Sequence, residues 1–167
     1  MGPRNSRHAH PMAIPLGQQV CRFIATGGYL GALPGAPGTA GSVLGLGLAW
    51  LSSRYAPNVQ IGVLLALFLL GVAIAGSAER WYGVKDHGSI IIDEIVGMAM
   101  ALAMLPFHVG YVIAAFVLFR FFDIIKPIAS LERLPGGWGI MCDDAFAAIL
   151  TNLMLQGVHL LLTRATP

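Results

Sequence analysis

Five apolar segments, separated by short polar or glycine- and proline-rich stretches, constrain the fold of this chain more than any other feature. The clearest is residues 59–77, which carries no charged side chain and is long enough to cross about 30 Å of hydrocarbon as a helix. The others are residues 39–53, 89–106, 110–123 and 140–162. We therefore predict an all-α fold, a polytopic membrane bundle with about five membrane-embedded helices.

The composition supports an integral membrane protein. Hydrophobic residues make up 56% of the chain and charged residues only 11%, against about 25% in soluble domains. The formal charge of +2 is not arranged as a basic stripe interleaved with aromatic residues, which argues against a nucleic-acid partner. Cys21 and Cys142 lie far apart without CxxC spacing, so neither a zinc site nor a disulfide framework is expected.

The N-terminal part of the chain divides into three stretches. Residues 1–19 are polar and are expected to form a flexible cytoplasmic tail, and residues 20–29 to form a short interfacial helix. Residues 31–42 contain too many glycines and prolines to continue a helix. Thr39 is a natural N-cap for the next apolar segment, which is short for a full span, so crossing the membrane and re-entering it both remain open. Residues 20–164 are then a single integral-membrane domain.

Lysine and arginine positions predict the topology, because these residues are enriched in short cytoplasmic loops. With the N-terminus inside, the cytoplasmic side receives eight of the ten cations: Arg4, Arg7, Arg22, Arg80, Lys85, Arg120, Lys126 and Arg133. Only Arg54 and Arg164 fall on the opposite side. All eight acids fall on the cytoplasmic side as well, although the rule makes no use of them: Glu79, Asp86, Asp93, Glu94, Asp123, Glu132, Asp143 and Asp144.

The gathering of acids and cations on one face predicts a site. Charged groups at membrane depth are costly and usually mark function. Clustered carboxylates without cysteine or paired histidine ligands suit a hard cation, Mg²⁺ before Ca²⁺ or Mn²⁺. Arg120, Asp123 and Lys126 are spaced three apart and share one flank of a helix. Three predicted helices begin at this face and direct their N–H groups toward it, which favours an anion, so we expect a site for a phosphorylated lipid.

Simpler interpretations compete for some of these residues. Asp143 and Asp144 could merely complement a helix dipole, and Glu79 and Glu132 are expected to be solvated loop charges. Glycines within the apolar segments are expected to allow close helix packing rather than ligand contact: Gly45, Gly47, Gly62, Gly71 and Gly76. An alternative function is a small ion or proton transporter with an acidic cytoplasmic vestibule. Against it, the acids stop at one face of the membrane.

Four ordered motifs carry a resemblance to a known family. They are residues 37–42 (PGTAGS), residues 86–98 (DHGSI, then DE and GM), residues 119–127 (FR, D and KP), and residues 136–144 (GG, GIM and DD). Together they resemble the phosphatidylglycerophosphatase A family over about residues 23–157. The chain departs from that pattern at Pro135, where family members carry a histidine. The resemblance implies a bacterial inner-membrane, Mg²⁺-dependent phosphatase that converts phosphatidylglycerophosphate to phosphatidylglycerol.

A mechanism follows as a hypothesis. The catalytic candidates, which would act with bound Mg²⁺, are Asp86, Asp93, Glu94, Asp143 and Asp144, and Asp123 joins them as a candidate metal ligand. The candidates for binding the substrate phosphate are Arg120, Lys126, Thr39, Ser42 and His87. Direct attack by water and an aspartyl-phosphate intermediate through Asp93 or Asp143 both remain open.

Overall fold

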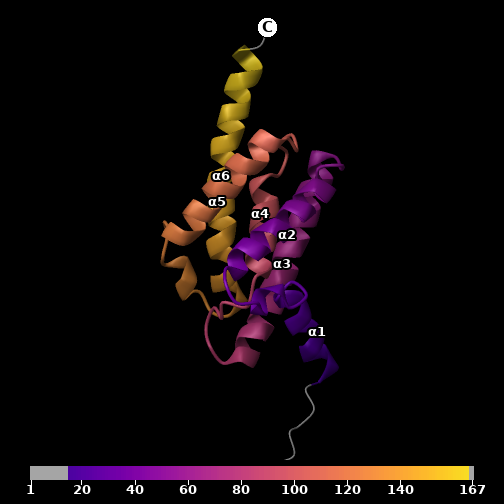
Figure 1. Ribbon diagram of the computed structural model, residues 1–167, viewed down its shortest axis with the longest axis vertical. Coiled ribbons are helices and arrows are strands. Elements are labelled where there is room, and N and C mark those ends of the chain that lie inside the picture. Colours follow the sequence, from indigo (N-terminus) through magenta and orange to yellow (C-terminus); the bar gives the residue numbers. More distant parts are fainter. Residues whose placement is uncertain (1–14, 166–167) are drawn as a thin grey trace, which may run out of the picture.

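The computed structural model describes residues 15–165, and within them the fold is all-α, as predicted. The helices are α1 (Leu16–Ala25), α2 (Pro37–Ser52), α3 (Pro57–Tyr82), α4 (Ile92–Ala101), α5 (Val109–Ile125) and α6 (Gly137–Ala165), with 3-10 turns η1 (Leu30–Ala32) and η2 (Leu131–Arg133). The helix α1 lies at the opposite end of the molecule from the last turns of α6 (Figure 1). Most of the predicted N-terminal tail, residues 1–14, lies outside the described residues.

Each predicted apolar segment contains a helix, but several ends differ. The first helix begins at Leu16, four residues before the predicted start. The helix α2 begins at Pro37 with Ala36 as its N-cap, so the prediction of Thr39 as N-cap was wrong. Proline suits the first helical position because its fixed φ is helical and its missing N–H would have no intrahelical partner there. The helix α3 continues to Tyr82, five residues beyond the predicted end of its apolar run.

Two of the helices, α3 and α6, are long and apolar enough to cross a membrane. The helices α2 and α5 have 16 and 17 residues, so at 1.5 Å per residue each extends about 25 Å. The predicted third span, residues 89–106, is not one helix, because α4 has only 10 residues and extends about 15 Å. Residues 89–91 precede it without helical structure, and the N–H of Ile91 donates instead to the carbonyl of Ala25 at 2.9 Å.

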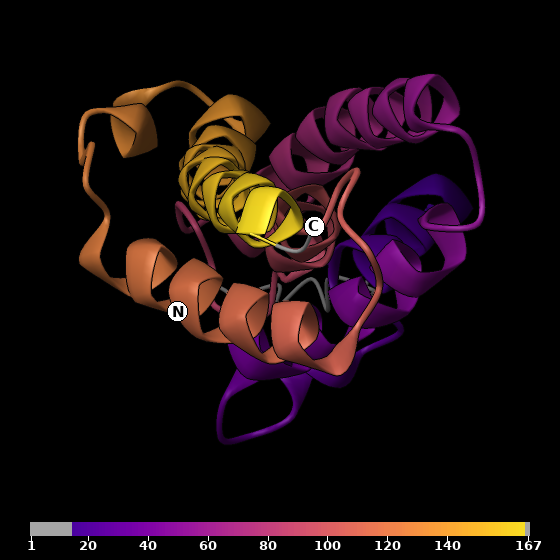
Figure 2. The ribbon, with the colours of Figure 1, turned by 90° about the horizontal axis from the view of Figure 1, so that it is seen from above.

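The short helix α4 is the centre of the bundle. It contacts α2, α3, α5 and α6, and viewed along the long axis it lies among these four helices (Figure 2). Seven of its ten residues are buried. The helix α2 approaches α4 closely, since a Cβ added at Gly45 would lie 2.6 Å from the Ile95 carbonyl oxygen. Glycine on α2 therefore brings the backbones of the two helices together.

The glycine prediction is confirmed at three positions and wrong at two. Added Cβ atoms would also clash at Gly71, 2.6 Å from the Met141 side chain, and at Gly76, 2.9 Å from the backbone nitrogen of Gly137. At Gly47 and Gly62 they would meet nothing within 4 Å. Close packing thus concentrates where α2 meets α4 and where α3 meets α6.

Polar side chains complete the backbone hydrogen bonding where α4 ends inside the bundle. Asn152 of α6 donates its Nδ2 to the carbonyls of Ala101 at 3.1 Å and Ala103 at 2.9 Å. Gln60 of α3 accepts from the Met104 N–H at 2.9 Å. In a membrane, a helix can stop within the protein only when neighbouring groups satisfy the backbone that it frees. These side chains therefore stabilise the short α4.

We predict that Asn152→Leu lowers the free energy of unfolding by about 1–2 kcal/mol, because it removes a donor to the Ala101 carbonyl and the shorter of the two side-chain hydrogen bonds to the Ala103 carbonyl. Denaturant titration of the purified protein in detergent measures the change. Gln156→Leu is the matched control, since its bonds to the same turn are longer, at 3.3 and 3.5 Å, and its effect should be smaller. Equal stability of Asn152→Leu and the unmodified protein would contradict this role.

Candidate active site

A cleft of about 320 Å³ opens at the end of the bundle where α2, α4 and α6 begin and α5 ends. Eight ionisable residues singled out from the sequence line it: Asp86, Asp93, Glu94, Arg120, Asp123, Lys126, Asp143 and Asp144. They come from four separate parts of the chain, namely the loop after α3, the first turn of α4, the end of α5 and the first turns of α6. The predicted gathering of acids and cations at one end is thus observed.

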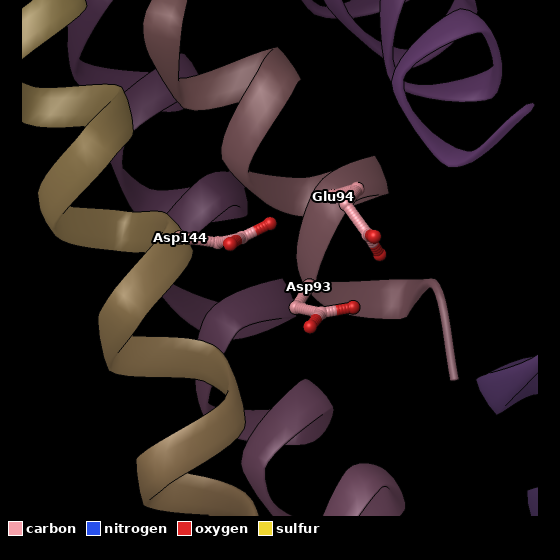
Figure 3. Close-up of side chains that lie close together, drawn as sticks. All are labelled: Asp93, Glu94 and Asp144. Carbon is pink, nitrogen blue, oxygen red and sulfur yellow. The ribbon is translucent and has the colours of Figure 1, made fainter. Parts of the chain in front are cut away.

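Three carboxylates form a compact group inside this cleft, which we call the carboxylate triad: Asp93 and Glu94 from α4, and Asp144 from α6. Oxygens of the three lie within 4.8 Å of one another. Figure 3 shows Asp144 reaching from α6 toward the first turn of α4, from which the other two side chains extend. Asp93 and Asp144 are only 7% and 4% exposed.

The carboxylate triad has the properties of a cation site. Each member has one buried oxygen without a hydrogen-bond partner among the described residues: Asp93 Oδ1, Glu94 Oε2 and Asp144 Oδ2. Buried polar atoms are normally paired, and grouped carboxylates repel one another. A hard divalent cation held by the three carboxylates would compensate their charge, and an all-oxygen donor set is the one that Mg²⁺, Ca²⁺ and Mn²⁺ prefer. The residues present therefore fit such an ion.

The remaining acids of the cleft are paired with cations. Arg120 hydrogen-bonds to Asp123, and its Nη1 lies 4.0 Å from Glu94 Oε1. Lys126 Nζ lies 3.2 Å from Asp143 Oδ2 and 3.9 Å from Asp86 Oδ2. The six candidate metal ligands thus divide into the carboxylate triad, of which only Glu94 approaches a cation in the part of the chain that the structure describes, and three acids that pair with Arg120 or Lys126, namely Asp86, Asp123 and Asp143.

Asp86 and Lys126, which both line the cleft, have shifted pKa values and an uncommon backbone conformation. Burial lowers the pKa of the Lys126 ammonium, but hydrogen bonds to Glu132 and Asp143 outweigh it and raise the pKa above its ordinary value. Burial raises the pKa of the Asp86 carboxyl, and the nearby Lys126 offsets part of that rise. Both residues adopt positive φ, 48° and 51°, which is strained for side chains other than glycine and recurs at functional sites. Lys126 therefore remains a cation at neutral pH and faces the cleft.

Three residues proposed as phosphate ligands do not line the cleft. Thr39 is exposed on the first turn of α2. Ser42 is buried within α2 and donates its hydroxyl to the Gly38 carbonyl at 2.9 Å. His87 stacks on Tyr82 with ring centroids 4.0 Å apart, and its Nδ1 accepts from the Ser89 N–H. The side chains of Ser42 and His87 hydrogen-bond to neighbouring backbone instead.

Sequence reasoning missed the role of Gly38 in the cleft. A Cβ added there would lie 2.6 Å from Glu94 Oε1 and 2.7 Å from an Arg120 guanidinium nitrogen. The absence of a side chain therefore lets Glu94 and Arg120 lie directly against the start of α2. The Pro-Gly pair at the start of an apolar run could have indicated this role. Proline favours the first position of a helix, which places Gly38 in the first turn of α2, at the end that faces the cleft.

The family model and two of the three relatives found by comparison with known proteins carry the same name. The family model described as phosphatidylglycerophosphatase A matches residues 23–159. A protein named phosphatidylglycerophosphatase A from Haemophilus influenzae is 43% identical over 82% of this chain and 87% of its own length. One of the same name from Escherichia coli is 35% identical over 77% of each chain. A putative phosphatidylinositol-3-phosphatase from Bacteroides thetaiotaomicron is 36% identical over 80% of this chain and 89% of its own. No solved structure matches.

We predict that the purified protein binds Mn²⁺, a spectroscopic substitute for Mg²⁺, at the carboxylate triad. Asp93→Asn and Asp144→Asn should each weaken binding by more than the roughly tenfold that is typical of losing an outer partner of a metal ligand. Titration followed by electron paramagnetic resonance measures the affinity. Glu79→Gln, on α3 outside the cleft, is the charge-matched control and should bind normally. Unchanged affinity in both triad variants would exclude this site.

Proposed function

The chain belongs to the phosphatidylglycerophosphatase A family, and we propose that it removes the terminal phosphate of phosphatidylglycerophosphate in a Mg²⁺-dependent reaction. The observation that carries the proposal is one cleft in which the carboxylate triad, each member with a buried oxygen that has no partner among the described residues, lies beside Arg120 and Lys126. Carboxylates that can hold a divalent cation, together with fixed positive side chains, are the groups that stabilise a transferring phosphoryl group. The reaction class therefore follows from the same residues that carry the family motifs.

In this proposal the carboxylate triad holds the Mg²⁺. When bound, the cation supplies Lewis-acid polarisation of the phosphoryl oxygens. Asp93 and Glu94 extend from the first turn of α4 and Asp144 from α6, so the triad joins two helices that pack together in the core. Packing fixes the ligands before substrate arrives, which limits the reorganisation that binding requires.

Arg120 and Lys126 orient and neutralise the phosphomonoester. Both line the cleft, and each is held by a carboxylate, Arg120 by Asp123 and Lys126 by Asp143. These pairs keep the cations in place without adding net positive charge that would trap the released phosphate. Asp143 pairs with Lys126 and Asp93 belongs to the carboxylate triad, so neither aspartate is assigned as the nucleophile. Water attacks the phosphorus directly in this proposal. A single direct attack inverts the configuration of a phosphoryl group made chiral with oxygen isotopes.

We predict that the protein releases phosphate from phosphatidylglycerophosphate only when Mg²⁺ is present. Asp93→Asn and Asp144→Asn should each reduce the rate by roughly a hundredfold or more, because each removes a charged ligand of the cation. Phosphate release in mixed detergent micelles measures the rate, with chelator as the metal-free condition. Near-normal rates in both variants, with folding preserved, would contradict the assignment.

Two alanine variants of α2 separate the cleft from the rest of the bundle. Gly38→Ala places a methyl group against Glu94 and Arg120 and should slow phosphate release strongly. Gly47→Ala makes the same change on the same helix, at a position where the added methyl meets nothing within 4 Å. Equal effects of the two variants would place the activity elsewhere.

We also propose how the protein sits in the bacterial inner membrane. The helices α2, α3, α5 and α6 cross it and α4 ends within the bundle, which leaves α1 at the cytoplasmic surface. Arg80, Lys85, Lys126 and Arg133 all lie at or beyond the cleft end of their helices, whereas Arg54 and Arg164 lie at the other end. The excess of cations supports a cytoplasmic location for the cleft.

Single cysteines test this orientation after Cys21 and Cys142 have been replaced by serine. We predict that a membrane-impermeant maleimide labels Ser130→Cys, an exposed residue beside η2, only in inside-out vesicles. Ala56→Cys, exposed before α3, should be labelled only in right-side-out vesicles. Labelling of both cysteines from one side would contradict the proposed arrangement, in which the two ends of the bundle lie on opposite sides of the membrane.

A further inference from the structure

A second cleft adjoins the first at the same end of the molecule. It has a volume of about 510 Å³ and is lined by Lys85, Asp86, Ala129, Glu132, Arg133, Gly139 and Ile140. Asp86, Gly139 and Ile140 also line the first cleft, so the two cavities share a wall. A ligand that is too large for the first cleft can therefore extend into the second.

The second cleft is lined by two cations that form no ion pair within the described residues. Lys85 and Arg133 are both exposed, and no carboxylate oxygen lies within 4.0 Å of either charged group there. The acids of this cleft are directed to Lys126, since Glu132 hydrogen-bonds to it and Asp86 Oδ2 lies 3.9 Å from it. Positive charge is thus available to a ligand while the negative charge is partly neutralised.

Close packing holds Arg133 at the edge of the first cleft. A Cβ added at Gly139 would lie 2.6 Å from the Leu134 carbonyl oxygen and 2.9 Å from that of Glu132. The segment that carries Arg133 therefore lies directly against Gly139 in the first turn of α6. Gly139 precedes Asp143 by four residues, which is about one helical turn. Arg133 of the second cleft and Asp143 of the first are thus held by one packed contact between η2 and α6.

We propose that Lys85 and Arg133 bind the phosphodiester of the lipid substrate while its phosphomonoester occupies the first cleft. This inference rests on the proposed function. Phosphatidylglycerophosphate carries two phosphates on one glycerol, and two adjoining clefts with separate cations match that pair. Arginine suits the diester because its planar guanidinium donates two parallel hydrogen bonds to phosphate oxygens. The second cleft then makes the enzyme selective for lipids that carry both groups.

The test compares phosphatidylglycerophosphate with phosphatidic acid, which has a phosphomonoester but no phosphodiester. Arg133→Gln and Lys85→Gln should each raise KM for phosphatidylglycerophosphate about tenfold with little change in kcat, because a charge-assisted hydrogen bond is lost. Rates with phosphatidic acid should not change. The product phosphatidylglycerol keeps the diester, so its inhibition constant should rise by a similar factor.

Arg80→Gln removes an exposed cation near the same end of the protein, outside both clefts, and should leave every parameter unchanged. Normal kinetics in Arg133→Gln and Lys85→Gln, or equal losses with both lipids, would overturn the diester site while leaving the phosphatase proposal intact. If the unmodified protein releases no phosphate from phosphatidylglycerophosphate, the proposed function fails, and this inference fails with it.

Discussion

The clustered charge of three carboxylates, two buried and one partly buried, is the constraint on which the rest of this structure depends. Asp93, Glu94 and Asp144 are close enough to share one ion, and each keeps a buried oxygen without a partner in the described part of the chain. Such a group is costly in a poorly solvated interior unless a cation compensates it. Nearby lysine and arginine are engaged largely with other acids, so a divalent ion is the natural counter-charge. Stability of the bundle and capacity for phosphoryl chemistry are therefore linked at one point.

The rest of the fold brings these side chains together. Alternating helix directions place the starts of α2, α4 and α6 and the end of α5 at one end of the bundle. Glycines on α2 allow its backbone to lie against α4, and Gly38 leaves room for Glu94 and Arg120. At the other end of α4, Asn152 and Gln60 satisfy the backbone where the helix stops. Neighbouring helices thus hold α4 at both ends. This keeps Asp93 and Glu94 of α4 close to Asp144 of α6.

Much of this arrangement could be predicted from the sequence, because charged side chains are costly inside a membrane and therefore gather at the ends of apolar helices. The positions of Asp93, Arg120 and Asp144 relative to the apolar runs were enough to place them at one end. The pairing of individual acids could not be predicted, since it depends on side-chain direction: Asp143 contacts Lys126 while its neighbour Asp144 joins the triad. The length of α4 was also hidden, because an apolar run does not reveal that polar groups on other helices will end the helix early.

The central claim is that the carboxylate triad holds one divalent ion. Crystals grown with Mn²⁺ and measured at its absorption edge test this most directly, since anomalous scattering locates the metal itself. We predict a peak bounded by the carboxylates of Asp93, Glu94 and Asp144 that is lost in crystals of the Asp144→Asn variant. A peak bound only by other residues, or no peak in crystals saturated with Mn²⁺, would contradict the account.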